Sequence, residues 1–475
     1  MYRLLTGEEI PLEFHRVRVV QRTRLIPAGD RLSAMRRAGH NTFHLPSRDV
    51  FLDMLTDSGV NAVSDRQLAA MHGADEAYAG SESFVRLQGT AEEIFAMPFL
   101  LPVCQGRAAE DIICRALVRP GSVVPMNYHF TTIQPAIAAC GGEIAQIPVD
   151  EALDTGNPHP FKGNFHIPRL ARTLGRERER IPFIRVEACA NLLGGQPFSL
   201  QNLRQVRLLA DGHGIPVLLD ASLLAENLHL IREREPECRG MDIRALVREI
   251  ASLCSVIYFS GRKLGCARGG AILCSDADLF ERMKDLAAPY GGFFTYGGMA
   301  PRDMESLAVG LEEAMDPTAI RHSPDCVAYM VRALAENGIP VVIPPGALGC
   351  YLDAGKILAH VPRERCPAAA LASALYLTSG IRAMERGILS SARGKDGQPI
   401  PPPLELVRLA LPRRTFTLSQ VRYAVDRIVR LHGMRDLIGG LRFAGERERL
   451  RLFWGKMLAE DGWDGNLLSA LEAEG

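Results

Sequence analysis

The chain lacks two features that would each place it in a broad class. Its 55 Lys and Arg residues equal its 55 Asp and Glu residues, so the formal net charge is zero. A protein that binds nucleic acid through bulk charge needs surplus cations to displace counterions, which argues against that class. No stretch approaches the roughly 18 apolar residues of a membrane-spanning helix, and Met1–Leu12 carries charges without an apolar segment. These absences predict a cytoplasmic protein that works apart from membranes and nucleic acids.

Paired cysteines and the common catalytic signatures are missing as well. The eleven cysteines include no CxxC pair, which is typical of neither a disulfide framework nor a zinc site, so we expect reduced and mostly buried thiols. The sequence contains no P-loop, no GxGxxG between a strand and a helix, no HExxH and no GxSxG. Nucleotide-dependent hydride transfer, P-loop hydrolysis and serine-hydrolase chemistry all lose support.

The middle of the chain has the pattern of an α/β unit. Short runs rich in β-type residues alternate with helix-like stretches such as Leu203–Gly212, which predicts a largely parallel sheet with ligands at the carboxyl ends of its strands. The predicted strands are Pro98–Val103, Glu143–Val149, Pro182–Val186, Pro216–Asp220, Ser255–Ser260 and Gly270–Cys274.

From about Pro317 the pattern changes to a smaller α+β domain. Three predicted helices alternate there with two predicted strands, and the segment Gly394–Pro403 is typical of a surface loop. The first 60 or so residues show no sheet pattern, and Arg16, Arg18, Arg22 and Arg24 are typical of an extended arm. We predict an N-terminal arm with part of the small domain over residues 1–62, a large domain over 63–316 and a small domain over 317–475. The predicted helices and strands of the small domain are Cys326–Asn337, Ala368–Gly380, Leu418–His432, Val341–Ile343 and Leu404–Leu411.

Two segments of the large domain carry chemistry. Ser260-Gly-Arg-Lys263 follows an apolar strand and returns through Gly269 to another. A lysine held between buried strands has a lowered pKa and is nucleophilic, as a Schiff-base lysine must be; a turn with its charges in water is the alternative. Asp220 ends another buried strand, where it could pair with the pyridine nitrogen of pyridoxal phosphate (PLP) or cap a helix.

At these segments the sequence resembles the β-eliminating lyases, the family of tyrosine phenol-lyase and tryptophanase. The resemblance extends over roughly Ile26 to Phe453. It implies the aspartate-aminotransferase-like PLP fold (fold type I): a mostly parallel seven-stranded sheet in the large domain, a smaller α+β domain and a homotetramer with shared active sites. It is carried by LTDSGVNA from Leu55, DEAYAGSE from Asp75, QGRAAE from Gln105, NLLGGQP from Asn191, DASLLAEN from Asp220, YGG from Tyr296 and MERG from Met384.

The resemblance also implies roles for the matching residues. Lys263 holds PLP and moves the α-proton of the substrate, while Tyr78, reaching in from a neighbouring subunit, is the general acid. Phe130 stacks on the pyridine ring and Asp220 pairs with its nitrogen. Arg408 binds the substrate carboxylate. The residues implied for the cofactor phosphate are Gln105, Gly106, Arg107, Ser260 and Arg262, and those implied to assist Arg408 are Thr56, Ser58 and Asn191, the last also a cofactor ligand.

Two residues favour the phenol-lyase branch of the family. Thr131 stands where the tryptophanase branch tends to carry Asp, and Arg386 matches the arginine that engages a phenolic hydroxyl. An indole offers only an N–H donor, which arginine cannot accept. The expected activity is cleavage or formation of the Cβ–substituent bond of an aromatic L-amino acid, giving a phenol-type product, pyruvate and ammonia. The ring pocket is expected to include Phe293, Leu452 and Phe453.

Departures from the family pattern keep other activities open. Leu223 replaces an arginine that contacts the cofactor, Leu264 replaces an aspartate, and Arg268 stands near an asparagine that ligates potassium. Arg268 could substitute for that ion beside Gly59 and Glu76, so a potassium requirement stays open. The alternatives are β-elimination from tryptophan or S-substituted cysteine, a specialised biosynthetic β-substitution, and a PLP-binding homologue without turnover.

Overall fold

A seven-stranded sheet forms the centre of the larger half of the molecule. The computed structural model describes residues 1–391, 401–445 and 451–473. The strand order is β4-β10-β9-β8-β7-β5-β6, and β10 alone runs antiparallel to its neighbours. The predicted seven-stranded, mostly parallel sheet is confirmed. The strands are β4 (Phe99–Val103), β5 (Val123–Met126), β6 (Glu143–Gln146), β7 (Ile184–Glu187), β8 (Val217–Asp220), β9 (Val256–Ser260) and β10 (Gly270–Cys274).

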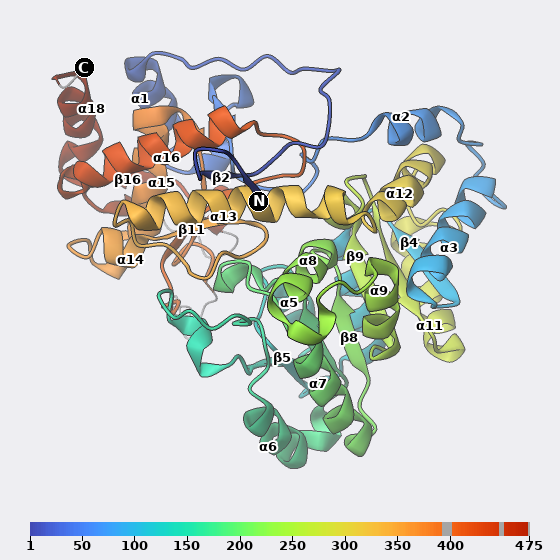
Figure 1. Cartoon of the computed structure of the whole chain (residues 1–475). Coiled ribbons are helices and arrows are strands. Elements are labelled where there is room, and N and C mark those ends of the chain that lie inside the picture. The colour runs from blue at the N-terminus through green and yellow to red at the C-terminus, as the bar shows by residue number, and fades with distance from the viewer. Residues whose placement is uncertain (392–400, 446–450, 474–475) are drawn as a thin grey trace.

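Helices cover both faces of this sheet, which explains why its central strands are buried throughout (Figure 1). Successive side chains of a strand point to opposite faces: Val217 and Leu219 pack with α3, α7, α9 and α12, whereas Leu218 packs with α4, α5 and α11. The helices of this half are α2 (Asp65–His72), α3 (Glu82–Phe95), α4 (Gly106–Leu117), α5 (Ile133–Ala139), α6 (Ile167–Glu177), α7 (Leu200–His213), α8 (Leu224–Arg234), α9 (Ile243–Ser252), α10 (Gly261–Leu264), α11 (Ala277–Gly291) and α12 (Pro301–Glu313).

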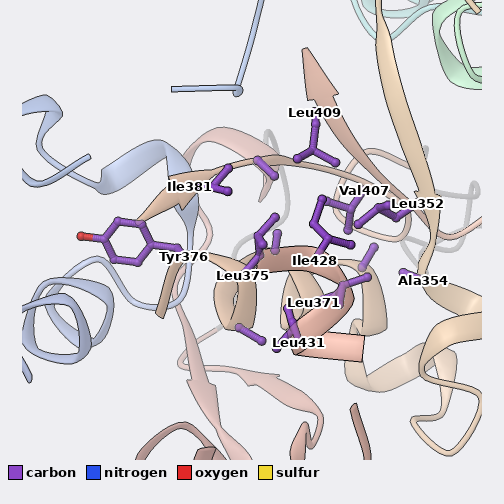
Figure 2. Packing of buried hydrophobic residues seen from close by; sticks show 14 of the residues in the cluster. Leu352, Ala354, Leu371, Leu375, Tyr376, Ile381, Val407, Leu409, Ile428 and Leu431 are labelled. Atoms are coloured by element: carbon purple, nitrogen blue, oxygen red, sulfur yellow. The ribbon is translucent and has the colours of Figure 1, made fainter. Parts of the chain in front are cut away.

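A second core surrounds a three-stranded antiparallel sheet of order β11-β14-β13. Figure 2 shows Leu371 and Leu375 of the buried helix α15 against Val407 and Leu409 of β14 and Ile428 of α16. The helix α13 runs between the two halves of the molecule (Figure 1) and contacts both α8 and α16. The elements of this half are α1 (Ala28–Arg37), β3 (Leu52–Asp53), α13 (Pro317–Glu336), β11 (Gly349–Asp353), α14 (Ala354–Ile357), α15 (Pro367–Ser379), β12 (Ile381–Arg382), β13 (Met384–Arg386), β14 (Leu406–Ala410), α16 (Leu418–Gly433), β15 (Leu441–Phe443), α17 (Arg451–Trp454), β16 (Met457–Ala459) and α18 (Trp463–Ala473).

The structure corrects three local predictions. Val341–Ile343 is not a strand, since only an isolated bridge joins Val341 to Leu352. The first 60 residues do contain strands, β1 (Tyr2–Arg3), β2 (Glu9–Ile10) and β3, but each has two residues and is too short to show alternation. The strand β5 was missed because Pro125 interrupts a run of only four residues.

Other predictions are confirmed or stay open. The eleven cysteines are free, and most of them are buried. Among the described residues, no helix combines the length and apolarity that crossing a membrane requires. The predicted loop Gly394–Pro403 falls largely outside the described residues. The division at residues 62 and 316 stays a prediction.

Candidate active site

The predicted functional residues follow strands that end at one edge of the large sheet. Asp220 is the last residue of β8 and Ser260 the last of β9, while Gln105 comes shortly after β4. In the sheet register, Gly270 of β10 lies opposite both Ser260 and Val103. The segments that begin at Gln105 and Ser260 therefore meet at the carboxyl edge, where open α/β sheets bind ligands.

Gly106 and Ser260 bring the two segments predicted to bind phosphate into contact. A Cβ on Gly106 would lie 3.1 Å from the Cβ of Ser260, so a side chain at Gly106 would push the segments apart. The helix α4 begins at Gly106, and its first N–H groups are available to an anion. Asn61 and Gly59 fix the backbone of Arg262: its carbonyl accepts hydrogen bonds from Asn61 Nδ2 (2.9 Å) and from the Gly59 amide (3.3 Å). The Arg262 Nε is buried and has no hydrogen-bond partner among the described residues.

Two cationic side chains from different parts of the chain lie near the ring of Phe130. The Nζ of Lys263 lies 5.2 Å from the centroid of the Phe130 ring, and the guanidinium carbon of Arg386 lies 5.9 Å from it. Lys263 also lines a small cavity together with Leu223 and Asp57. The predicted ring-stacking residue, the predicted Schiff-base lysine and the predicted phenol-binding arginine are thus brought together.

Arg408 anchors the region predicted to bind the substrate carboxylate. Its side chain is buried in β14, and its NH1 donates to Asn191 Oδ1 (3.2 Å) while its NH2 donates to the Leu55 carbonyl (2.9 Å). The latter contact brings the loop of Thr56 and Ser58 to Arg408, and within that loop the Ser58 amide donates to Thr56 Oγ1 (3.1 Å). Among the described residues, the Arg408 Nε and the Asn191 Nδ2 lack partners. Unpaired buried donors of this kind are costly unless a ligand accepts from them.

Arg386 is buried nearby on β13 with even fewer partners. Its Nε and NH1 donate to no atom of the described residues. Burial, and next the positive charge of Arg408, lower the pKa of the Arg386 guanidinium. Two buried guanidinium groups this near each other repel, so an anion or an oxygen acceptor between them would stabilise both.

Asp220 is held by a residue that the sequence reasoning missed. Arg185 on β7 donates from NH2 to Asp220 Oδ2 (2.7 Å), and the Ser222 amide donates to Asp220 Oδ1 (3.0 Å). The alternation of charged Arg185 and Glu187 within the apolar run Phe183–Glu187 was the available signal, because charged residues are almost never fully buried unless paired.

For several predicted site residues, the described part of the chain shows contacts outside this cluster. Tyr78 is 62% exposed, and its ring contacts that of Tyr296 in a tilted arrangement, with centroids 5.2 Å apart. Phe293 is 45% exposed and contacts Phe294. Thr131 is half-buried, directly after Phe130.

The segment of Leu452 and Phe453 approaches the phosphate region from the C-terminal part. Leu452 is buried, and the ring of Phe453 packs on Phe43, with centroids 5.1 Å apart. The guanidinium carbon of Arg107 lies 5.6 Å from the Phe453 ring centroid. These contacts bring the predicted pocket residues close to a predicted phosphate ligand.

The predicted cation-site residues lie in one neighbourhood. Arg268 is exposed, and both Gly59 and Glu76 have positive φ. Burial raises the pKa of Asp303, and the nearby negative charge of Glu76 raises it further. The positive charges of Arg268, Arg302 and Arg262 oppose this shift. Arg268 therefore acts on the same carboxyl group as Glu76.

The residues at this edge fit PLP. Unpaired donors at Arg262 and Asn191, the close approach of Gly106 to Ser260, and the lysine beside Phe130 suit a phosphate-bearing aromatic aldehyde. The fold agrees with this class. A lysine-to-alanine variant of a serine palmitoyltransferase from S. paucimobilis, solved with a bound PLP–myriocin aldimine, matches with a TM-score of 0.58 at 14% identity over 82% of this chain and 89% of that one. An aspartate aminotransferase of Thermus thermophilus matches with a TM-score of 0.56 at 14% identity, over 87% and 97%. The architecture is that of PLP enzymes of fold type I.

Sequence comparison then gives the family. The model of the β-eliminating lyases matches residues 53–426, and the chain belongs to that family of PLP-dependent lyases. A tyrosine phenol-lyase of Nostoc punctiforme is 40% identical over 93% of this chain and 95% of its own length. One from Symbiobacterium thermophilum is 40% identical over 93% and 97%. A protein described as a probable tryptophanase, from Aeropyrum pernix, is 39% identical over 93% and 96%.

Proposed function

We propose that the protein is a PLP-dependent carbon–carbon lyase of the tyrosine phenol-lyase kind. It cleaves, or in reverse forms, the Cβ–substituent bond of an aromatic L-amino acid, with a phenol-type product, pyruvate and ammonia. The observation that carries the proposal is the buried guanidinium of Arg386, which lies by the Phe130 ring and has two nitrogens without a partner among the described residues. Such a group is suited to a ring oxygen and has no acceptor in an indole N–H.

The residues at the sheet edge would bind the cofactor and move protons. Lys263 would hold PLP and carry the α-proton of the substrate, with Phe130 on the face of the ring and Asp220 at its nitrogen. The phosphate would be bound by Gln105, Gly106, Arg107, Ser260 and Arg262. PLP, when bound, supplies an electron sink that stabilises negative charge at the α-carbon.

The substrate would lie between the two arginines of the smaller half. Arg408 would bind the carboxylate with Asn191, Thr56 and Ser58, since its unpaired Nε supports a further bond. Arg386 and Thr131 would hold the oxygen of the ring, next to Phe293, Leu452 and Phe453.

Tyr78 would complete the site from a neighbouring subunit. The 62% exposure of its side chain supports this role, because an exposed tyrosine is free to enter a neighbour's site. The protein would then be a homotetramer with shared active sites in the cytoplasm. As general acid, Tyr78 would protonate the ring carbon and so turn the ring into a leaving group.

A substrate screen tests the proposal. Purified protein with added PLP is incubated with tyrosine, tryptophan and S-methylcysteine in parallel, and pyruvate, phenol and indole are measured. Phenol and pyruvate from tyrosine are expected, with no activity in Lys263→Ala. Indole from tryptophan without phenol from tyrosine would refute the branch assignment. PLP binding without pyruvate from any substrate would refute the lyase activity.

A further inference from the structure

A cluster of buried charges lies directly beside the carboxyl edge of the large sheet. It consists of Arg185 and Glu187 on β7, Asp220 on β8, Tyr258 on β9 and Glu110 on α4, all with at most 6% of their surface exposed. Arg185 is at its centre. Besides Asp220, it donates from Nε to Tyr258 Oη (2.7 Å) and from NH1 to Glu187 Oε2 (3.0 Å), and its NH2 lies 3.9 Å from Glu110 Oε1.

Strand register puts these groups on one face of the sheet. Glu187 is opposite Asp220, and Asp220 is opposite Tyr258, so the three side chains point the same way. The remainder of that face is apolar, with Phe183, Leu218 and Val256 in its core. Charges in such surroundings persist only when they are paired and hydrogen-bonded.

The cluster has more negative than positive groups. Three carboxyl groups surround one guanidinium. Burial raises the pKa of Glu110 to about 7, and it also raises the pKa of Glu187. Even with Glu110 protonated, Arg185 alone faces both Asp220 and Glu187. One further cation against Asp220 would balance the cluster.

The contacts of Asp220 fix its orientation. Oδ2 accepts from Arg185 and Oδ1 accepts from the Ser222 amide, so the carboxylate cannot rotate without breaking one of these bonds. An ionised carboxylate has about four lone-pair sites, so the two bonds leave capacity for about two more donors. Arg185 thus leaves Asp220 oriented and able to accept from a ring N–H.

We propose that Arg185 is a positioning residue for the cofactor, one that holds Asp220 in the orientation and charge state in which it pairs with a protonated pyridine nitrogen. The inference rests on the proposed function, because it assigns PLP to this edge. Arg185 acts through Asp220 and does not touch the ring. Losing it should weaken PLP binding and alter the protonation of the bound ring.

The test compares full-length variants in their affinity for PLP and in the pH midpoint of the visible absorbance of bound cofactor. Arg185→Met alone leaves buried carboxylates unpaired and is expected to unfold at a lower temperature. The main variant is therefore the double change Arg185→Met with Glu187→Gln, which removes one charge of each sign. Arg31→Met is the matched control, since Arg31 is a buried arginine that donates to Leu377 and Ile26 carbonyls in the other half.

We expect the double variant to bind PLP about 10- to 100-fold more weakly, the range found for partners that orient metal ligands, with a shifted pH midpoint. Arg31→Met should retain both values. Arg185→Lys keeps the charge but not the forked guanidinium group. Its PLP affinity and pH midpoint should lie between those of the double variant and wild type, and it serves as the test if the double variant does not fold. If the folded variants have wild-type PLP affinity and pH midpoint, this inference is overturned and the proposed function is not affected. Failure of the wild-type protein to bind PLP would overturn the proposed function and this inference with it.

Discussion

Replacing Arg386 should separate substrate recognition from stability. Arg386→Met keeps much of the buried volume of the side chain and removes its charge. In the structure the Arg386 Nε and NH1 have no acceptor among the described residues, and Arg408 is a second cation close by. The native protein therefore gains little from this guanidinium in the absence of substrate, whereas the proposed reaction uses it to hold the ring oxygen.

The magnitudes follow from these two unpaired donors. A hydrogen bond to a charged group contributes about 1.5–3 kcal/mol, so two such bonds contribute about 3 kcal/mol or more. Each 1.4 kcal/mol is about tenfold, so kcat/KM for tyrosine should fall at least ~100-fold. The free energy of unfolding should stay the same or rise, because an unpaired buried cation is removed. Arg413→Met is the matched control: Arg413 is buried but paired with Glu226 through its Nε (2.6 Å). Its loss should lower the free energy of unfolding by about 3–5 kcal/mol.

The assay is pyruvate formation from tyrosine and from S-methylcysteine, combined with urea unfolding of the cofactor-free protein. S-methylcysteine has no ring oxygen, so its kcat/KM should change far less in Arg386→Met. An equal loss with both substrates, together with a loss of stability like that of Arg413→Met, would refute the reasoning and make Arg386 a structural residue.

Three further predictions concern neighbouring groups. The folded-state pKa of Glu110 is raised to about 7 from 4.5, so its neutral form is favoured by folding, and this stabilisation is present at low pH and lost as pH rises toward 7. Urea unfolding should show wild type losing about 3 kcal/mol relative to Glu110→Gln between pH 4.5 and pH 8, and parallel pH curves would contradict this. If Arg268 replaces a bound monovalent cation, activity should be insensitive to potassium in wild type and fall in Arg268→Ala; strong potassium activation with a silent Arg268→Ala would show the opposite. Leu223→Arg should destabilise the fold by several kcal/mol in urea unfolding, because Leu223 packs with Leu348, Tyr351 and Leu406 in an apolar cluster; a stable, more active variant would show that the site still accepts the arginine.

The fold could be predicted where periodicity was strong. Six of the seven strands from Phe99 to Cys274 were predicted because each lies in a run of β-type residues, and β5 was missed. Five of the six lie within about two residues of the observed bounds, whereas the predicted run Glu143–Val149 ends early as the strand Glu143–Gln146. Strands of two residues, such as Tyr2–Arg3, gave no signal, since alternation needs several positions. The run Val341–Ile343 looked like a strand but follows Pro340 and makes only a bridge.

The site could be predicted only in part. Residues at or shortly after strand ends, such as Asp220 and Lys263, could be proposed from the sequence because a parallel sheet collects them at one edge. The charges of Arg185 and Glu187 in an apolar run signalled a buried pair, but the sequence does not tell which strands are neighbours, so the link to Asp220 was missed. That link arises because β8 and β9 lie on one side of β7. The proposed role of Tyr78 in a neighbouring subunit stays a prediction, because a single chain shows only that its side chain is 62% exposed.

The charges of the site complement the charges of the proposed ligands, although the whole chain sums to zero. Guanidinium nitrogens of Arg262, Arg386 and Arg408 that lack a partner in the described part of the chain lie where an anionic phosphate, ring oxygen and carboxylate would bind. The excess of carboxyl groups lies around Asp220, where the ligand would be cationic. Each arrangement costs free energy in the empty protein, because like charges are held together out of water. Ligand binding removes that cost, so the same residues that make the empty site unfavourable supply its affinity for a ligand with this pattern of charge.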